Sequence, residues 1–230
     1  MSVTLSSLPP WSHTAIETYE QCPRKYYHKF IAKDIVEKPS QAMLDGRRDH
    51  DALEKRLKDG VALPEHLAQQ EPLCRSIISA KQGAKLYTEL KMGLTRELEP
   101  CAFFDKTGKV NARSALDVGI HKDEKFALMD WKTGKKKEFK DQLEIMSAFI
   151  FRHFPKVMRV VACNIWLQTS EVGHKYIFHR EQEPEIWQKI IPKVQKMEAS
   201  FAKNNWPEKV TPLCGWCPVV NCSHNPEYKP

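Results

Sequence analysis

The segment ALDVGIHKDEKFALMDWKTGK, residues 115–135, is the strongest indication of the fold because it contains two short apolar runs separated by a polar connection. We expect strands over residues 112–121 and 125–131, since short apolar runs bounded by polar residues are typical of β-structure. The letters HKDE between them predict a hairpin-like connection, so the two strands are expected to pair antiparallel. The rest of the chain is interpreted around this hairpin.

Side chains alternate between the two faces of a strand. In the first strand, Leu116, Val118 and Ile120 are therefore expected on one face and Asp117 on the other. This pattern makes Asp117 a lone acid in an otherwise apolar strand.

Asp130 and Lys132 are two residues apart in the second strand and share a face, with Trp131 on the opposite face. Antiparallel pairing brings Asp117 and Asp130 toward each other at the open end of the hairpin. A carboxylate buried without a partner costs several kcal/mol, so two of them predict a cation between them, and hard oxygen ligands suit Mg²⁺ or Mn²⁺. The Lys132 ammonium could then hold or deprotonate a water, or stabilise an oxyanion. The alternative interpretation is an ion pair at a sheet edge beside a polar turn.

The order of helical and strand patterns indicates the fold class. Helices come first, then a meander of strands, a helix, two more strands, a long helix and a Pro-rich coil that contains cysteines. This order predicts an α/β fold with a mixed central β-sheet flanked by helices. The expected helices cover residues 15–31 with a kink or a break into two consecutive helices at Pro23, 40–60, 65–83, 137–154 and 182–203 with an interruption near Pro192. The further strands are expected within 84–100, 157–170 and 173–180.

Length and composition fit one soluble domain over residues 1–230. Hydrophobic residues make up 41% of the chain and charged residues 28%, and no apolar run is long enough for a membrane span. The N-terminal sequence lacks the pattern of a signal peptide, so we expect a cytoplasmic protein. The net charge of +7 favours a polyanionic partner such as nucleic acid.

Seven cysteines in an intracellular chain favour metal ligands or free thiols over disulfides. Three are scattered among apolar neighbours and are expected to be buried: Cys74, Cys101 and Cys163. The other four divide into a lone residue near the N-terminus and a C-terminal cluster: Cys22, and Cys214, Cys217 and Cys222. Four thiolates can bind zinc or an iron–sulfur cluster, and the count does not choose between them.

The segment ALDVGI followed by LMDWKTGK resembles the D…(D/E)xK motif of the PD-(D/E)XK nuclease superfamily, and its DxKTGK ending resembles the RecB-like exonuclease branch. In that branch an upstream helix carries a pattern like G-x-x-x-H-x-x-x-E, and GRRDHDALE supplies Gly46, His50 and Glu54 at those positions. A glutamine on the following helix is also typical, and it corresponds to Gln142. A tyrosine often stands four residues later, where this chain has Met146.

The resemblance implies a restriction-endonuclease-like core over about residues 40–203 and a role for each matching residue. Lys132 would serve the attacking water, and Gln142 would orient the substrate. Glu54 would either orient the His50 ring or be a solvated helix residue, and Glu89 would be a further acid near the site. The divalent metal would be ligated by His50, Asp117, Asp130 and the backbone carbonyl of Trp131.

The arrangement of one early and three late cysteines is similar to that of the 4Fe–4S nucleases of the same branch, including those of CRISPR adaptation. It implies a cluster bound by Cys22, Cys214, Cys217 and Cys222. Such a cluster would staple residues 14–31 to 206–224 without a redox role. Many members have five residues between the last two cysteines where this chain has four, and His224 nearby keeps Zn²⁺ as the alternative.

Two segments rich in cations are expected to contact DNA. PRKYYHKF, residues 23–30, combines cations for phosphates with tyrosines for unpaired bases. KTGKKKEFK, residues 132–140, adds a lysine run that either contacts DNA or is a solvated face. Trp216 is expected in the core rather than as a stacking surface.

The function implied is a metal-dependent DNA exonuclease of a bacterium or phage-infected cell, in recombination, repair, phage replication or CRISPR-type processing. Its substrate would be DNA that is single-stranded or has free ends. Its protein partner would be a second copy of the chain, or a helicase or recombination protein. The alternative is a nucleic-acid-binding subunit whose nuclease site is vestigial.

Overall fold

The computed structural model describes residues 8–35, 39–105 and 107–228. Its centre is a mixed seven-stranded sheet in the order β2-β1-β3-β4-β5-β6, with β7 also paired to β5. Only β4 and β5 run parallel, and helix α5 connects them, as a parallel pair requires. The strands are β1 (Lys85–Leu94), β2 (Pro100–Cys101), β3 (Ala112–Lys122), β4 (Lys125–Lys132), β5 (Arg159–Trp166), β6 (Glu171–Val172) and β7 (Tyr176–His179).

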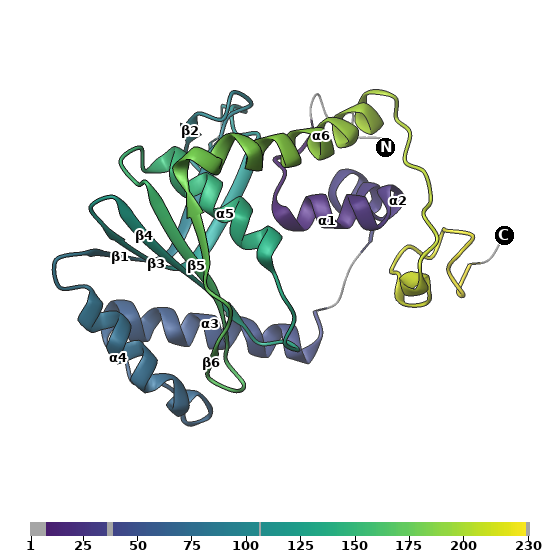
Figure 1. Ribbon diagram of the computed structural model, residues 1–230. Coiled ribbons are helices and arrows are strands. Elements are labelled where there is room, and N and C mark those ends of the chain that lie inside the picture. Colours follow the sequence, from purple (N-terminus) through teal and green to yellow (C-terminus); the bar gives the residue numbers. More distant parts are fainter. Residues whose placement is uncertain (1–7, 36–38, 106, 229–230) are drawn as a thin grey trace.

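Helices cover both faces of this sheet, as Figure 1 shows. The longest two are amphipathic, and α3 ends where Gly60 takes the left-handed conformation with φ of 74°. The α-helices are α1 (His13–Gln21), α2 (Pro23–Tyr26), α3 (Gln41–Asp59), α4 (Glu71–Ala80), α5 (Lys140–His153) and α6 (Glu183–Ala202). Shorter turns are η1 (Tyr27–Ala32), a π-helix, and the 3₁₀ segments η2 (Glu65–Gln70), η3 (Arg180–Gln182) and η4 (Pro212–Trp216). No helix of the described residues is both long and apolar enough to cross a membrane.

Two hydrophobic cores lie on opposite faces of the sheet. The first packs α1, α5 and α6 on one face, and the second packs α3 and α4 on the other. Figure 1 shows α5 and α6 above the sheet and α3 and α4 below it. The expected α/β architecture with a mixed central sheet is confirmed.

The strict alternation expected along β3 is wrong. Leu116 belongs to the first core, whereas Val118 and Ile120 belong to the second. The switch falls at Asp117, where the neighbouring strand β1 is also distorted at Glu89. A strand that changes its buried face cannot keep a period of two, so the pattern fails where the sheet departs from regular geometry.

Other elements differ from the prediction in detail. The helix expected over residues 65–83 begins as a 3₁₀ turn and becomes α-helical only at Glu71, one residue before Pro72. The interruption expected near Pro192 is absent, because α6 runs through it. Pro192 lacks only one backbone donor, and apolar residues before and after it, including Ile190 and Val194, anchor the helix on the core. Two consecutive helices do meet at Pro23, as expected.

Candidate functional site

β3 and β4 separate from each other at Asp117. Their antiparallel pairing ends at the pair Val118–Met129. Beyond this pair, Asp117 Oδ2 accepts a hydrogen bond of 2.7 Å from the backbone N–H of Trp131. The two strands therefore form a fork with a carboxylate at its inner end.

Glu89 of β1 lies opposite Asp117 in a strained backbone conformation. The pairs Thr88–Val118 and Leu90–Leu116 flank this position in the β1–β3 ladder. The φ of Glu89 is 48°, in the left-handed region that residues other than glycine rarely adopt. Such strain is typical of functional sites, where the surroundings hold it in place. Two facing carboxylates also favour a cation or a proton between them.

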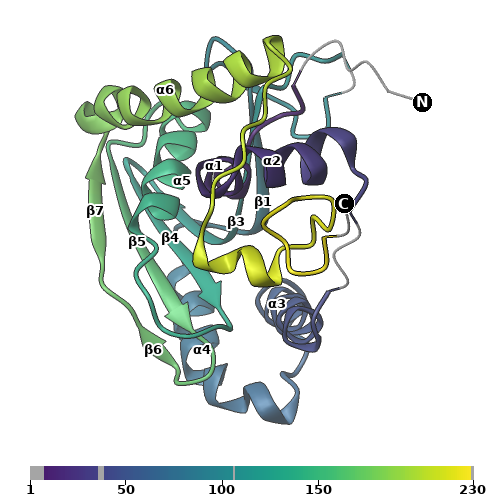
Figure 2. The same ribbon diagram turned by 90° about the vertical axis from the view of Figure 1, so that its right-hand side faces the viewer.

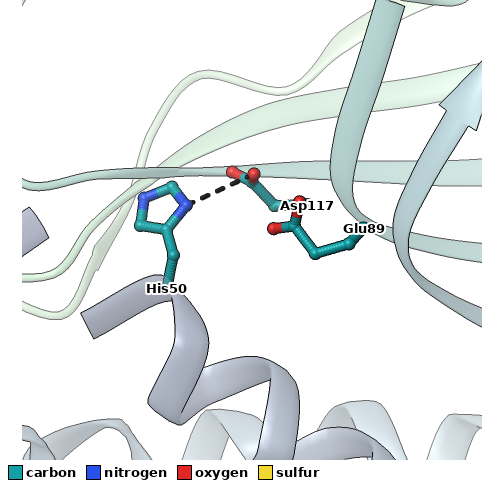
Figure 3. A group of neighbouring side chains, drawn as sticks. All are labelled: His50, Glu89 and Asp117. Atoms are coloured by element: carbon teal, nitrogen blue, oxygen red, sulfur yellow. Dashed lines mark ion pairs between the residues drawn. The ribbon is translucent and has the colours of Figure 1, made fainter. Parts of the chain in front are cut away.

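Helix α3, which packs on the second core, brings His50 to these acids. Figure 3 shows the His50 ring on its helix facing the carboxylates of Glu89 and Asp117. His50 Nδ1 lies 3.4 Å from Asp117 Oδ1, and ligand atoms of His50, Glu89 and Asp117 all lie within 4.8 Å of one another. The helix can approach because Gly46 has no side chain: a Cβ there would lie 2.9 Å from Thr133 Oγ1. One imidazole nitrogen and two carboxylates form a donor set that fits Mg²⁺ or Mn²⁺. We call these three residues the ligand trio.

Asp130, the third side-chain ligand expected from the sequence, has a different environment. Its side chain is only 4% exposed, and it accepts hydrogen bonds from Gln142 at 3.2 Å and from Asn164 at 2.9 Å. Lys132 Nζ lies 2.7 Å from Asp130 Oδ2. Within the described chain, Glu89 rather than Asp130 completes the group whose atoms are close enough to share one ion.

Lys132 is held beside Asp130 from three directions. Besides the ion pair, its Nζ donates a hydrogen bond of 2.8 Å to Gln142 Oε1 on α5. The same nitrogen lies 4.2 Å from the centre of the Phe139 ring. Because Gln142 bonds to both residues, the acid and the lysine have a defined relative position.

Burial and mutual repulsion shift the pKa values in this site. Burial raises the pKa of Asp130 to about 6, with a further rise from the Asp117 carboxylate that Lys132 and Asn164 oppose. Burial of the Glu89 carboxyl group also raises its pKa, and the negative charge of Asp117 raises it further. For His50, burial lowers the pKa, but the hydrogen bond to Asp117 and its charge outweigh that effect and raise it. A bound cation would lower all three values, so metal binding is expected to release protons.

The sequence left the role of Glu54 open between a partner that orients His50 and a solvated helix residue. The Glu54 side chain is 28% exposed and lies 3.8 Å from Lys58 in an i,i+4 pair, and its role stays a prediction. Met146, which stands where relatives often carry tyrosine, is buried in the first core.

The sequence analysis did not identify Asn164 as a site residue. A polar residue inside the apolar run VVACNIW is nevertheless the kind of signal that marks a buried polar contact.

The four cysteines expected to share a ligand line one cavity, although among the described residues they do not form a group with ligand atoms within 4.8 Å of one another. They are Cys22, Cys214, Cys217 and Cys222, and His224 lies in the same wall. The C-terminal segment reaches the first helices through an ion pair of 2.7 Å between Arg24 and Glu208. Figure 2 shows this segment, drawn in yellow, on the same side of the molecule as α2 and the start of α3. Cys74 and Cys163 are buried as expected, whereas Cys101 is half-buried.

The segments expected to contact DNA are only partly available. Tyr26 is fully buried and stacks on Trp206 with ring centres 5.8 Å apart, so it cannot stack on a base. In the lysine run, Lys136 pairs with Glu171 at 3.0 Å. Trp216, expected in the core, is 82% exposed, because the short η4 turn projects it from the C-terminal coil.

Comparison with known proteins agrees with this arrangement. A model of the PD-(D/E)XK nuclease superfamily matches residues 10–222. No curated protein matches the chain. Among solved structures, a candidate exonuclease from Eubacterium rectale aligns with a TM-score of 0.51 and 11% identity, over 90% of this chain and 86% of that one. A protein named SSO0001 aligns with a TM-score of 0.42 and 12% identity, over 96% of this chain and 89% of that one.

At 11% identity the structural likeness shows a shared fold only. The family model, in contrast, spans the helix that carries His50, the β3–β4 fork and the C-terminal cysteines. Because that match covers nearly the whole sequence, the chain belongs to the PD-(D/E)XK nuclease superfamily.

Proposed function

We propose that the protein is a metal-dependent DNA exonuclease of the RecB-like branch. The observation that carries the proposal is the ligand trio at the β3–β4 fork, with Lys132 and Gln142 on the neighbouring strand and helix. The superfamily consists of nucleases, and its members use divalent metals such as Mg²⁺ or Mn²⁺. The strained Glu89 opposite Asp117 supports a metal site, since two facing carboxylates are costly without a cation.

A divalent cation held by the trio would stabilise the charge that develops on the phosphodiester in the transition state. We propose His50, Glu89 and Asp117 as its ligands, with Asp130 and the Trp131 carbonyl as further ligands. Asp117 also holds the fork through the Trp131 N–H, so it has a positioning role besides ligation.

Lys132 would act on the attacking water. Its ammonium is fixed between Asp130 and Gln142, within 2.8 Å of each partner. A positioned ammonium can hold a water, take part in its deprotonation or stabilise an oxyanion. Gln142 would orient both the lysine and the substrate phosphate.

A cleavage assay on DNA of defined ends tests this function. Linear single-stranded, linear duplex and covalently closed circular DNA are incubated with EDTA, Mg²⁺ or Mn²⁺. An exonuclease should degrade the linear substrates only with metal and leave the circle intact. Asp117→Asn should abolish cleavage, and Glu54→Gln is the matched control on a neighbouring acid outside the trio. DNA binding without cleavage under every condition would instead support the vestigial nucleic-acid-binding subunit.

We propose further that the four cysteines bind a 4Fe–4S cluster that joins residues 14–31 and 206–224 into a single nuclease domain. Their arrangement around one cavity supports a shared ligand, and tying distant segments together converts binding energy into folding energy. Anaerobically purified protein should carry about four iron atoms per chain. Cys22→Ser should lose them and make the segment after Trp206 sensitive to protease. Stoichiometric zinc without iron would assign the cavity to Zn²⁺, with His224 as a further donor.

A further inference from the structure

Beyond the ligand trio, the β1–β3 pair presents a second set of polar side chains on the same face of the sheet. Leu90 packs against the first core and Met92 is buried in it, so Lys91, which lies between them in β1, points to the opposite face. His50 reaches Glu89 and Asp117 from that opposite face, because its helix packs on the second core. Lys91 therefore lies two residues beyond Glu89 on the face that carries the metal site.

Arg113 extends this set further from the trio. It pairs with Gly93 in the ladder and lies four residues before Asp117. Its neighbour Ala112 is buried in the first core, which places the Arg113 side chain on the opposite face. At about 3.3 Å per residue, Lys91 and Arg113 lie roughly 7 Å and 13 Å along the strands from the acids.

Two aromatic rings from the loop after β2 lie against these cations. Gly93 permits this, because a Cβ there would meet the carbonyl oxygens of Cys101 and Ala102 at 3.0 and 2.9 Å. Lys91 Nζ lies 5.5 Å from the centre of the Phe104 ring. The Arg113 guanidinium lies 5.3 Å from the Phe103 ring and 6.0 Å from the Phe104 ring.

This cluster is more exposed than a purely structural contact requires. Phe104 is 66% exposed, although a phenylalanine that only anchored the loop would gain stability by being buried. Among the described residues, neither Lys91 nor Arg113 forms an ion pair with a carboxylate. The Nε of Arg113 is buried and has no hydrogen-bond partner within the same part of the chain. Lys91 is thus exposed and the Arg113 side chain is half-exposed, and neither positive charge is neutralised by an ion pair in the part of the chain that the structure describes.

We infer that Lys91, Phe104 and Arg113 form a binding track for an unpaired DNA strand that leads to the ligand trio. Cations that follow one another along a β-strand can meet successive phosphates of an extended strand. An exposed aromatic ring between them can stack on a base, which is possible only where the base is unpaired. The inference rests on the proposed nuclease function, and it specifies single-stranded DNA at the cleavage site.

Binding measurements with matched variants test the track. The anisotropy of fluorescein-labelled oligo(dT) and of a labelled blunt duplex is followed over a range of salt concentrations. Ca²⁺ replaces Mg²⁺, and gels verify that the DNA stays intact. The variants are Lys91→Ala, Phe104→Leu, which removes the ring but keeps apolar volume, and Phe104→Trp, which keeps a ring. Lys85→Ala is the control, because Lys85 also lies over an aromatic ring on β1 but at the other end of the strand.

Phe104→Leu should weaken oligo(dT) binding roughly 5- to 100-fold, as expected for one lost base–aromatic stack, and Phe104→Trp should retain it. Lys91→Ala should reduce the slope of log Kd against log salt by about 0.7, the value for one phosphate contact on a single strand. Lys85→Ala should change neither quantity. Thermal unfolding checks that each variant is folded.

Three results would overturn the track. Oligo(dT) binding by Phe104→Leu that equals wild type would remove the stacking role. A loss by Lys85→Ala as large as that by Lys91→Ala would reduce the effect to overall charge. An equal loss on blunt duplex and on oligo(dT) would remove the specificity for unpaired bases. If the wild-type protein neither binds nor cleaves DNA, both the proposed function and the track are wrong. If the wild-type protein cleaves DNA but the variants bind oligo(dT) as tightly as it does, only the track is wrong.

Discussion

Replacement of Asp130 by asparagine should stabilise the metal-free protein above pH 6. The Asp130 side chain is 4% exposed, and burial together with the Asp117 charge raises its pKa from 3.8 to about 6. A raised acid pKa means that the folded state binds the proton more tightly than the unfolded chain does. The wild-type protein therefore loses stability as the pH rises from about 4 to 6, and the Asp130→Asn variant avoids this loss because its amide is neutral at every pH.

The magnitude follows from the shift. One pKa unit corresponds to about 1.4 kcal/mol, so a shift of about two units sets an upper limit near 3 kcal/mol. This shift is already net of the ion pair with Lys132, at 2.7 Å, which lowers the pKa of Asp130 and is lost in the variant. We expect Asp130→Asn to raise the free energy of unfolding by roughly 1–3 kcal/mol at pH 8 in EDTA and to have little effect at pH 4.

Urea unfolding at both pH values, with EDTA and with Mg²⁺, measures the effect. Asp123→Asn is the matched control, since Asp123 lies exposed in the β3–β4 turn, where its φ of 52° also suits asparagine. It should change stability little at either pH. Mg²⁺ should stabilise the wild-type protein more than Asp130→Asn. An Asp130→Asn protein that is less stable than wild type at pH 8 in EDTA would contradict this prediction, because it would show that the ion pair outweighs the cost of burying the charge.

Three further predictions concern the site. Glu89→Gln should weaken metal binding, measured by calorimetry, by more than the roughly 10- to 100-fold that is typical of losing an outer-shell partner, and Glu54→Gln should leave it unchanged. If the Glu89→Gln and Glu54→Gln proteins bind the metal equally well, Glu89 is not a ligand. Lys132→Ala should keep metal affinity and lower the cleavage rate roughly 10²- to 10⁴-fold, and a collapse of metal affinity with normal cleavage at saturating metal would contradict this. Gly46→Ala should lower the free energy of unfolding by roughly 1–3 kcal/mol, because its Cβ would lie 2.9 Å from Thr133 Oγ1. Combining it with Thr133→Ala should restore part of that stability. If the effects of the two substitutions on the free energy of unfolding simply add, the contact does not matter.

The local elements follow directly from the sequence. The hairpin over residues 112–131 was predictable because apolar runs and a polar turn are short-range signals. Helix α3 was predictable for a similar reason, since Ser40 caps its start and Gly60 ends it. The pairing of Asp130 with Lys132 also follows from sequence, because residues two apart in a strand share a face.

Only the tertiary structure decided which distant residues meet in the site. Glu89 lies on a strand 28 residues before Asp117, and its role depends on the β1–β3 register and on a left-handed φ that no composition or period encodes. The buried contact of Asn164 with Asp130 depends on the parallel pairing of β4 with β5. A period of two describes a regular strand, but it cannot indicate where a strand switches its buried face, as β3 does at Asp117. Local sequence patterns therefore predict the separate elements and the acid–lysine motif, whereas long-range packing, which such patterns do not encode, assembles the ligand trio.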